Sequence, residues 1–393
     1  MRQIFSSVAA LVLVLGPITV APQVAHAQTP VSVVGTKSAA CPDAQFSTIQ
    51  EAVDHASPGT VIRICPGTYP EQVSIKIALS LQGENGAVIE PSHLGVNTMG
   101  TFSGAPLAPI ILVKDTTDVD IQGVIVDGAN NDITACGPDF IGILYQNASG
   151  EVKRVAVRNI KLSTNLNGCQ SGSAILVQSG SAGMSVVDVA DSSIHDYQKN
   201  GITADGSGTE VQIENNVVTG VGATTGAAQN GIQISSGAGG SISKNTVANH
   251  IWSPCVSVTS CEAIGIDILV FQSDSVSVEQ NVAGISQTGI AIVANHATVI
   301  QNQVFNTLIF DGAALTGNDN NASYNSITHS AEAGVSIEGN NNLVRVNRIN
   351  EAAFGVLKAA GSTGNVINRN VISNALVSVQ DPAGRGSKAS PYR

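Results

Sequence analysis

The chain has 393 residues, 40 of them glycine, and a formal net charge of −11. Only 12% of the residues are charged and 43% are apolar, which excludes a disordered chain, because disorder requires high charge and low hydrophobicity. The acidic balance, with no basic stripe, also argues against nucleic acid and anionic membrane surfaces as partners.

The first 27 residues have the pattern of a secretory signal peptide. Arg2 precedes an apolar stretch at residues 8–15, and Ala25-His26-Ala27 stands before Gln28. This stretch is too short to cross a bilayer, and no later run approaches the roughly 18 apolar residues that a membrane span needs. We therefore expect a secreted or periplasmic protein without a membrane span. Its net charge changes from −11 to −12 when Arg2 is removed.

Residues 28–40 form a polar leader, and the folded domain is expected over residues 41–380. Phe46, Ile49, Ala52 and Val53 have the spacing of an amphipathic helix, which ends before Pro58-Gly59. Short strands are predicted at 61–64, 73–75 and 79–81. Because the end of a repeat domain exposes its core, the helix is predicted to cap the first coil. Residues 381–393 are expected to be a flexible tail.

From residue 201 onward, one short phrase recurs. A glycine followed by alternating apolar residues occurs at Gly201, Gly231, Gly265, Gly289, Gly312, Gly334 and Gly355. The spacings are 30, 34, 24, 23, 22 and 21 residues. Each phrase is followed by an asparagine with a small or β-branched apolar residue two places later, at Asn216, Asn245, Asn281, Asn302, Asn325, Asn347 and Asn370. A period of 21–24 residues with apolar alternation predicts stacked coils of parallel β-strand.

Residues 46–75, FSTIQEAVDHASPGTVIRICPGTYPEQVSI, together with these repeats, resemble right-handed parallel β-helix proteins of the pectin lyase-like superfamily. The cap is especially similar to that of pectin methylesterases. The resemblance implies an all-β fold, a single right-handed parallel β-helix with a short N-terminal capping α-helix. The later methylesterase phrases Q-D-T, V-D-F-I-F-G and L-G-R-P-W are absent, as are the motifs of polygalacturonases, pectate lyases and mannuronan epimerases. No catalytic residue can therefore be transferred from these enzymes.

In the superfamily, the glycine phrase resembles the first strand of a coil and the asparagine the turn after the second. Asparagine tolerates the left-handed backbone of such a turn, so we interpret the asparagine row as structural. Strand alternation then places Thr203, Gln233 and Asp267 on the outward face, followed by Asp205. Long insertions at 219–230 and 249–263 fall in the same coils. In the superfamily, a cleft between such loops holds polysaccharide.

The candidate site centres on the loop before Gly201. His195, Tyr197, Lys199 and Asp205 are the candidate catalytic residues, because proton abstraction beside a uronate carboxylate requires a base and a cation that neutralises the carboxylate. Candidate substrate-binding residues are Asp196, Gln233, Trp252 and Asp267. A solvated polar loop is the simpler explanation for residues 195–200, and Trp252 suits a loop anchor as well as a sugar platform.

The metal content is not determined by the sequence. A calcium ion held by Asp205 and Asp267 is one option, since calcium prefers several oxygen ligands. The two residues lie two coils apart, and coils rise about 4.8 Å each, so one ion cannot easily bridge both.

Six cysteines follow the signal peptide, and an even count in an exported chain favours disulfides over reduced, buried thiols. Sequential pairing gives Cys41–Cys65, Cys136–Cys169 and Cys255–Cys261. No cysteine or histidine spacing indicates zinc.

Two functions remain open. The first is an enzyme that acts on polysaccharide, most plausibly a lyase or epimerase of uronate-containing glycans. The second is a non-catalytic β-helix that binds glycan or has a structural role at the cell surface. The missing motifs favour the second, whereas the polar face and the long loops favour the first. In either case we expect a monomer whose partner is polysaccharide.

Overall fold

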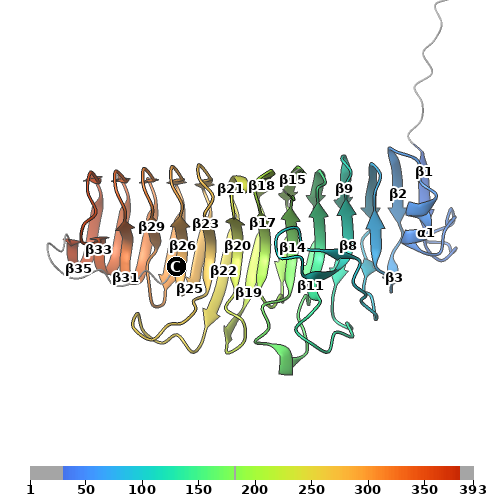
Figure 1. Cartoon of the computed structure of the whole chain (residues 1–393), viewed down its shortest axis with the longest axis horizontal. Helices are drawn as coiled ribbons and strands as arrows, with labels where there is room; N and C mark the ends of the chain where they lie inside the picture. The colour runs from blue at the N-terminus through green and yellow to red at the C-terminus, as the bar shows by residue number, and fades with distance from the viewer. Residues whose placement is uncertain (1–29, 181–182, 381–393) are drawn as a thin grey trace, which may run out of the picture.

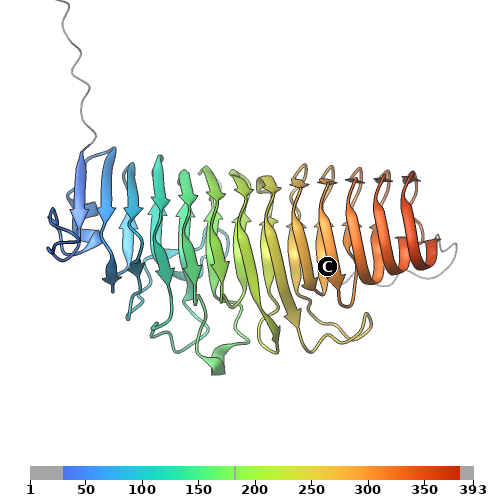
Figure 2. The same cartoon turned by 180° about the vertical axis from the view of Figure 1, so that it is seen from behind.

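The computed structural model describes residues 30–180 and 183–380, which form a single right-handed parallel β-helix (Figure 1). The predicted signal peptide and the predicted tail lie outside the described residues. Seen from both sides, the coils stack along one long axis, and the longer loops project from one edge (Figure 2). The fold predicted from the repeat is confirmed.

Each regular coil contributes three strands, which stack on their counterparts in neighbouring coils as three rows. Row 1 contains the glycine phrases: β4 (Val73–Ile75), β8 (Pro106–Lys114), β11 (Asp139–Gln146), β14 (Ser173–Gln178), β17 (Asn200–Asp205), β20 (Asn230–Ser235), β23 (Ile266–Phe271), β26 (Thr288–Val293) and β29 (Ala313–Thr316).

Row 2 is a 13-stranded sheet: β1 (Val31–Val34), β2 (Thr60–Ile64), β5 (Leu79–Gly83), β9 (Val119–Gln122), β12 (Gly150–Lys153), β15 (Ser185–Ala190), β18 (Thr209–Glu214), β21 (Gly239–Ser243), β24 (Ser277–Glu279), β27 (Thr298–Ile300), β30 (Asn321–Ser323), β32 (Leu343–Arg345) and β34 (Val366–Asn368).

Row 3 follows the asparagine turns: β3 (Gly67–Tyr69), β6 (Ala87–Ile89), β10 (Ile125–Asp127), β13 (Ala156–Arg158), β16 (Ser193–His195), β19 (Val217–Thr224), β22 (Thr246–Trp252), β25 (Val282–Ser286) and β28 (Gln303–Thr307). In the last coils, rows 3 and 1 merge into β31 (Ser326–Glu338), β33 (Arg348–Lys358) and β35 (Val371–Gln380). A short hairpin strand, β7 (Thr98–Met99), pairs antiparallel with β8, and a 3-10 turn spans Thr164–Leu166.

The predicted capping helix is present as α1 (Ile49–Asp54), which is short, about one and a half turns long. The Thr48 side chain accepts a hydrogen bond from the Glu51 amide, and the Glu71 carboxylate accepts from the amides of residues 49 and 50. Ile49, Ala52 and Val53 of this helix are buried against the first coil. The polar leader differs from its prediction, because residues 31–34 form β1 and pair with β2, burying Val33 and Val34.

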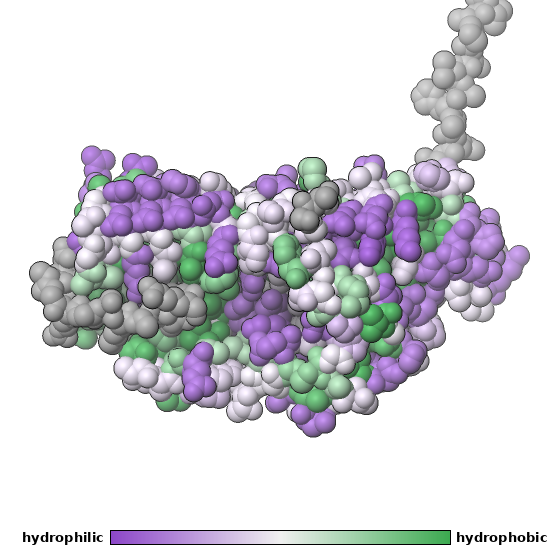
Figure 3. Space-filling model, viewed as in Figure 1, coloured by the Kyte–Doolittle hydropathy of each residue, from purple (hydrophilic) through white to green (hydrophobic). Residues whose placement is uncertain are grey.

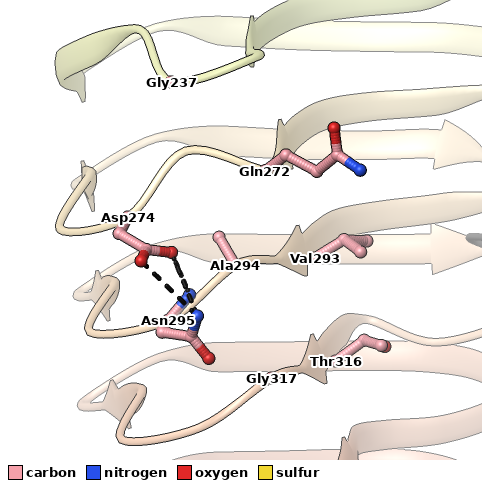
Figure 4. Close-up of a pocket in the computed structure, with 8 residues that line it drawn as sticks. All are labelled: Gly237, Gln272, Asp274, Val293, Ala294, Asn295, Thr316 and Gly317. Carbon is pink, nitrogen blue, oxygen red and sulfur yellow. Dashed lines mark hydrogen bonds between the residues drawn. The ribbon is translucent and has the colours of Figure 1, made fainter. Parts of the chain in front are cut away.

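The asparagine row forms a continuous ladder. From Asn216 to Asn347, the backbone amide of each asparagine donates to the side-chain oxygen of the next asparagine in the row. Asn245 N, for example, donates to Asn281 Oδ1 at 2.9 Å. A second ladder runs from Asp274 through Asn295 to Asn318 at the turns between rows 1 and 2, beside a pocket of about 590 Å³ (Figure 4). Both ladders satisfy turn amides. For the first ladder, this agrees with the structural interpretation of the asparagine row.

Three disulfides join the cysteine pairs predicted from the sequence, Cys41–Cys65, Cys136–Cys169 and Cys255–Cys261. The first ties the N-terminal cap, the second joins the row 3 to row 1 loops of two neighbouring coils, and the third closes a small loop between rows 3 and 1. Such bonds are typical of oxidising compartments. Within residues 30–180 and 183–380, no helix has the length and apolar character needed to cross a membrane.

Candidate functional site

The outward face of row 1 changes character along the axis. At β8, β11 and β14 it carries an apolar cluster of Leu107, Leu112, Ile141 and Leu144. At β23, β26 and β29 it carries a second apolar cluster that includes Ile266, Ala291 and Ala314, covered by the disulfide-closed loop around Cys255. Between them, β17 and β20 present polar side chains. Figure 3 shows hydrophilic side chains in a hollow near the middle of this face.

We call this polar area the recess. Its floor consists of two strands' outward residues: Asn200, Thr203, Asp205, Asn230, Gln233 and Ser235. They form a hydrogen-bonded chain: Asn230 Nδ2 donates to Gln233 Oε1 at 2.9 Å, and Gln233 Nε2 donates to Ser235 Oγ at 3.0 Å. Ser235 Oγ in turn donates to Asp205 Oδ1 at 2.9 Å. This network fixes the orientation of the amides and leaves a floor of donors and acceptors with one carboxylate.

Asn200 is a floor residue whose hydrogen-bonding capacity is not fully used. Its side chain is 9% exposed, and its amide donates to Thr203 Oγ1 at 3.1 Å. Its Oδ1 is buried and has no hydrogen-bond partner. An unpaired buried acceptor is costly, by about 1–3 kcal/mol. A ligand that donates a hydrogen bond here would remove that cost.

The wall of the recess at the edge between rows 3 and 1 is the loop 225–229. Lys199 Nζ donates to the Ala228 carbonyl at 2.7 Å, and Trp252 Nε1 donates to the Gly226 carbonyl at 2.9 Å. Burial lowers the pKa of Lys199 to about 8. Trp252 therefore acts as an anchor of this loop, one of the two roles considered for it, and the same loop holds the Lys199 ammonium.

The eight residues proposed from the sequence do not lie together. Asp205 and Gln233 lie in the recess, with Lys199 and Trp252 at its wall. His195 and Asp196 instead lie at the end of β16 in row 3, where His195 Nδ1 donates to Asp196 Oδ2 at 2.8 Å. That hydrogen bond, aided by the charge of Lys161, holds the pKa of Asp196 below its ordinary value. This pair faces away from the recess.

Tyr197 and Asp267 lie in the core. The Tyr197 hydroxyl is hydrogen-bonded to His250 Nε2, His250 Nδ1 to Asp267 Oδ1 at 2.6 Å, and Ser286 Oγ donates to Asp267 Oδ2 at 2.8 Å. All four side chains are fully buried. Burial raises the pKa of Asp267 to about 6 and that of Tyr197 well above its ordinary range. The prediction that Asp267 points outward is therefore wrong.

The strand register explains this error. Ile268, not Ile266, pairs with Ile232 and Ile290, so Asp267 stands where neighbouring coils have Gly231 and Gly289. A Cβ atom at Gly289 would come within 2.4 Å of Val304 Cγ1, and one at Gly231 within 2.3 Å of Val247 Cγ1. In the coil of Asp267, the residue in register with Val247 and Val304 is Ala283. The smaller alanine removes the side-chain obstacle that a β-carbon would otherwise meet.

The placement of Asp267 also bears on metals. Asp205 is outside the coil and Asp267 inside, so the two cannot share a calcium ion. Among the described residues, no group of three or more histidine, cysteine, aspartate or glutamate side chains could hold a metal ion.

Four floor residues were not among the candidates. Thr203 and Ser235 lie on the outward face that strand alternation predicts, whereas Asn200 and Asn230 do not follow from alternation. These two asparagines each directly precede a repeat glycine, and this shared position was the available signal. They pair in register on the outward face.

A family model described as periplasmic copper-binding protein (NosD) matches residues 256–388, less than half of the chain. Copper prefers histidine, cysteine and methionine ligands. This stretch contains two histidines, His296 and His329, no methionine, and Cys261, which is in a disulfide. Its described residues therefore do not fit a copper centre.

Solved structures show the same fold at low sequence identity. The lacto-N-biosidase of Eubacterium ramulus superposes with a TM-score of 0.59 at 9% identity, over 88% of this chain and 68% of that one. The A-module of the mannuronan C-5 epimerase AlgE6 of Azotobacter vinelandii gives 0.52 at 15% identity, over 85% and 93%. The A-module of the mannuronan C-5 epimerase AlgE4, from the same organism, superposes with a TM-score of 0.51 at 12% identity, over 85% of this chain and 92% of that one. No curated protein sequence matches the chain.

Proposed function

We propose that this chain is an extracytoplasmic protein that binds a glycan in the recess on row 1. The observation that carries the proposal is the recess itself: a floor of fixed amides and hydroxyls with an unpartnered acceptor, Asn200 Oδ1, between two apolar areas. Sugars are recognised by such neutral donors and acceptors. The fold is shared with carbohydrate-active proteins, which supports the proposal by analogy only. The disulfides and the signal pattern support export.

Acidic glycans are the favoured class of ligand. Lys199 is a half-buried cation that forms no ion pair among the described residues; its hydrogen bond goes to a carbonyl. A partly buried ammonium without a counter-charge is unfavourable, so a uronate carboxylate beside it would be stabilising. Because the chain as a whole is acidic, it does not attract an acidic glycan over long range, and the preference for a carboxylate acts only at short range, close to Lys199.

A lyase or epimerase activity is the second candidate, favoured by the lowered pKa of Lys199. A base that takes the proton beside a uronate carboxylate works best with a pKa near the working pH. In its neutral form, Lys199 would accept that proton; a lyase would then break the bond to the leaving oxygen, and an epimerase would return a proton to the other face. His195 and Tyr197 lose this role, because one faces away from the recess and the other lies in the core.

The binding proposal predicts a pH dependence. Affinity for acidic oligosaccharides is expected to fall as the pH rises through about 8, by up to tenfold per pH unit, because Lys199 loses its charge. Isothermal titration with oligouronates measures this. Lys199→Gln is expected to bind weakly at every pH with a flat profile. An unchanged profile in that variant would show that Lys199 is not the group responsible.

The catalytic candidate has a separate test. The protein is incubated with polyuronates, with and without calcium, while the ultraviolet absorbance of an unsaturated product and the stereochemistry of the uronates are followed. Turnover that disappears in Lys199→Gln would establish the enzyme. If the protein binds a polyuronate but forms no unsaturated product and inverts no uronate, the lyase and epimerase activities are ruled out for that substrate and the glycan-binding function stands.

A further inference from the structure

The loop 100–105 at the tip of the β7–β8 hairpin reaches along row 1 towards the recess. Thr98 Oγ1 donates to Gln146 Oε1 at 2.6 Å, and Gln146 Nε2 donates to the Met99 carbonyl at 2.7 Å. One coil further, Thr101 Oγ1 donates to Gln178 Oε1 at 3.0 Å. Successive residues of the hairpin thus bind successive coils, and the loop ends beside β17. In Figure 1 it crosses in front of β11 and β14.

Phe102 belongs to this loop, and its ring lies against Gly206. A Cβ atom at Gly206 would lie 1.9 Å from Phe102 Cζ, so only glycine allows the ring to rest there. Gly206 directly follows Asp205 of the recess floor. Yet Phe102 remains 53% exposed. An aromatic ring beside a polar floor, with about half of its surface open, is suited to stacking against a flat apolar face of a ligand.

Gln178 provides an independent indication of a ligand at the end of the strands where Phe102 lies. Its side chain is 4% exposed, and its register partner is Asp205. Thr101 occupies its Oε1, but its Nε2 is buried without a partner. The recess thus has an unpaired acceptor at Asn200, and an unpaired donor lies beside it at Gln178, at the opposite end of the strands. Five residue steps along a strand separate the two positions, roughly 16 Å.

We propose that Phe102 is a stacking platform for one sugar of the bound glycan and that Gln178 Nε2 donates a hydrogen bond to the same sugar. The glycan then lies along the strands, from Asn200 to Phe102, across the long axis of the β-helix. This span exceeds one sugar ring, so the ligand is an oligosaccharide segment. The inference rests on the proposed function and specifies the direction and length of the ligand.

Titration of oligouronates and neutral oligosaccharides of increasing length tests the platform. Phe102→Ala is expected to weaken binding of the long oligosaccharides about tenfold and to leave the shortest bound ones unchanged, since these reach only the Asn200 end. Phe102→Tyr is expected to bind like the unsubstituted protein. Gly206→Ala, which displaces the ring, is expected to show the same length-dependent loss as Phe102→Ala.

The outcomes separate this inference from the proposed function. If the unsubstituted protein binds glycans and Phe102→Ala binds long ones equally well, the platform is wrong and the recess stands. An equal loss for short and long oligosaccharides would also contradict the platform. If the unsubstituted protein binds no glycan of either class, the proposed function and the platform both fail.

Discussion

Asp267→Ala is expected to lower the free energy of unfolding by about 3–5 kcal/mol, the largest effect of any single substitution considered. Alanine would leave His250 Nδ1 and Ser286 Oγ without the carboxylate that both now contact in a fully buried site. Chemical denaturation of the variant and the parent measures the difference. Asp205→Ala, which removes a carboxylate from the outward face, is the matched control and should cost less than about 1 kcal/mol. Equal effects would contradict the account of the core.

Neighbouring coils have glycine where this coil has Asp267, and valine where it has Ala283. This paired difference predicts that the two positions are coupled in their effect on the free energy of unfolding. Ala283→Val should destabilise the parent by about 1–3 kcal/mol, because the added methyl groups meet the Asp267 side chain. In an Asp267→Gly background, which restores the glycine of neighbouring coils, the same valine should be tolerated or stabilising. Denaturation of the single and double variants gives the coupling energy. Purely additive costs would show that the two residues do not compensate each other.

The second large effect is expected in the asparagine ladder. Asn281→Ala should cost about 3 kcal/mol, because several buried groups lose their partner at once. Asn281 Oδ1 accepts from the amide and the side chain of Asn245, and Asn281 Nδ2 donates to the Ile242 carbonyl at 2.9 Å. Denaturation of the variant again measures the loss.

Asn370 provides the matched control for the ladder. It makes the corresponding contacts, accepting from Asn347 and donating to the Val344 carbonyl, but it lies in the half-exposed last coil. Water can replace its hydrogen bonds, so Asn370→Ala should cost clearly less than Asn281→Ala. Similar losses for both variants would mean that burial does not set the strength of the ladder.

The fold and its ladder could be predicted because they follow from local rules that every coil repeats. The glycine phrase, the asparagine two places before an apolar residue and the helical spacing at Phe46 each constrain only neighbouring residues and the coil above or below. The disulfides followed from sequence order for a similar reason, since each pair closes within about one coil.

The site could be predicted only in part, because it depends on departures from the repeat. Gly265-Ile266 imitates the start of the phrase, but the pairing with β20 aligns Asp267 with Gly231, a position whose β-carbon faces Val247 of the core. Asp196 adopts a left-handed backbone with φ of 56°, so simple alternation fails and Tyr197 enters the core. The hairpin loop with Phe102 lies more than 90 residues from Asp205, and no local pattern indicates that they meet.

The central claim is that the recess, rather than the histidine-bearing surface of row 3, binds glycan. Titration of oligouronates into the parent, an Asn230→Ala/Gln233→Ala variant and a His195→Ala variant tests it most directly. The recess variant is expected to lose at least tenfold in affinity, because both amides of the floor chain are removed. The His195 variant should bind like the parent. Loss of binding in His195→Ala with retention in the recess variant would contradict the account.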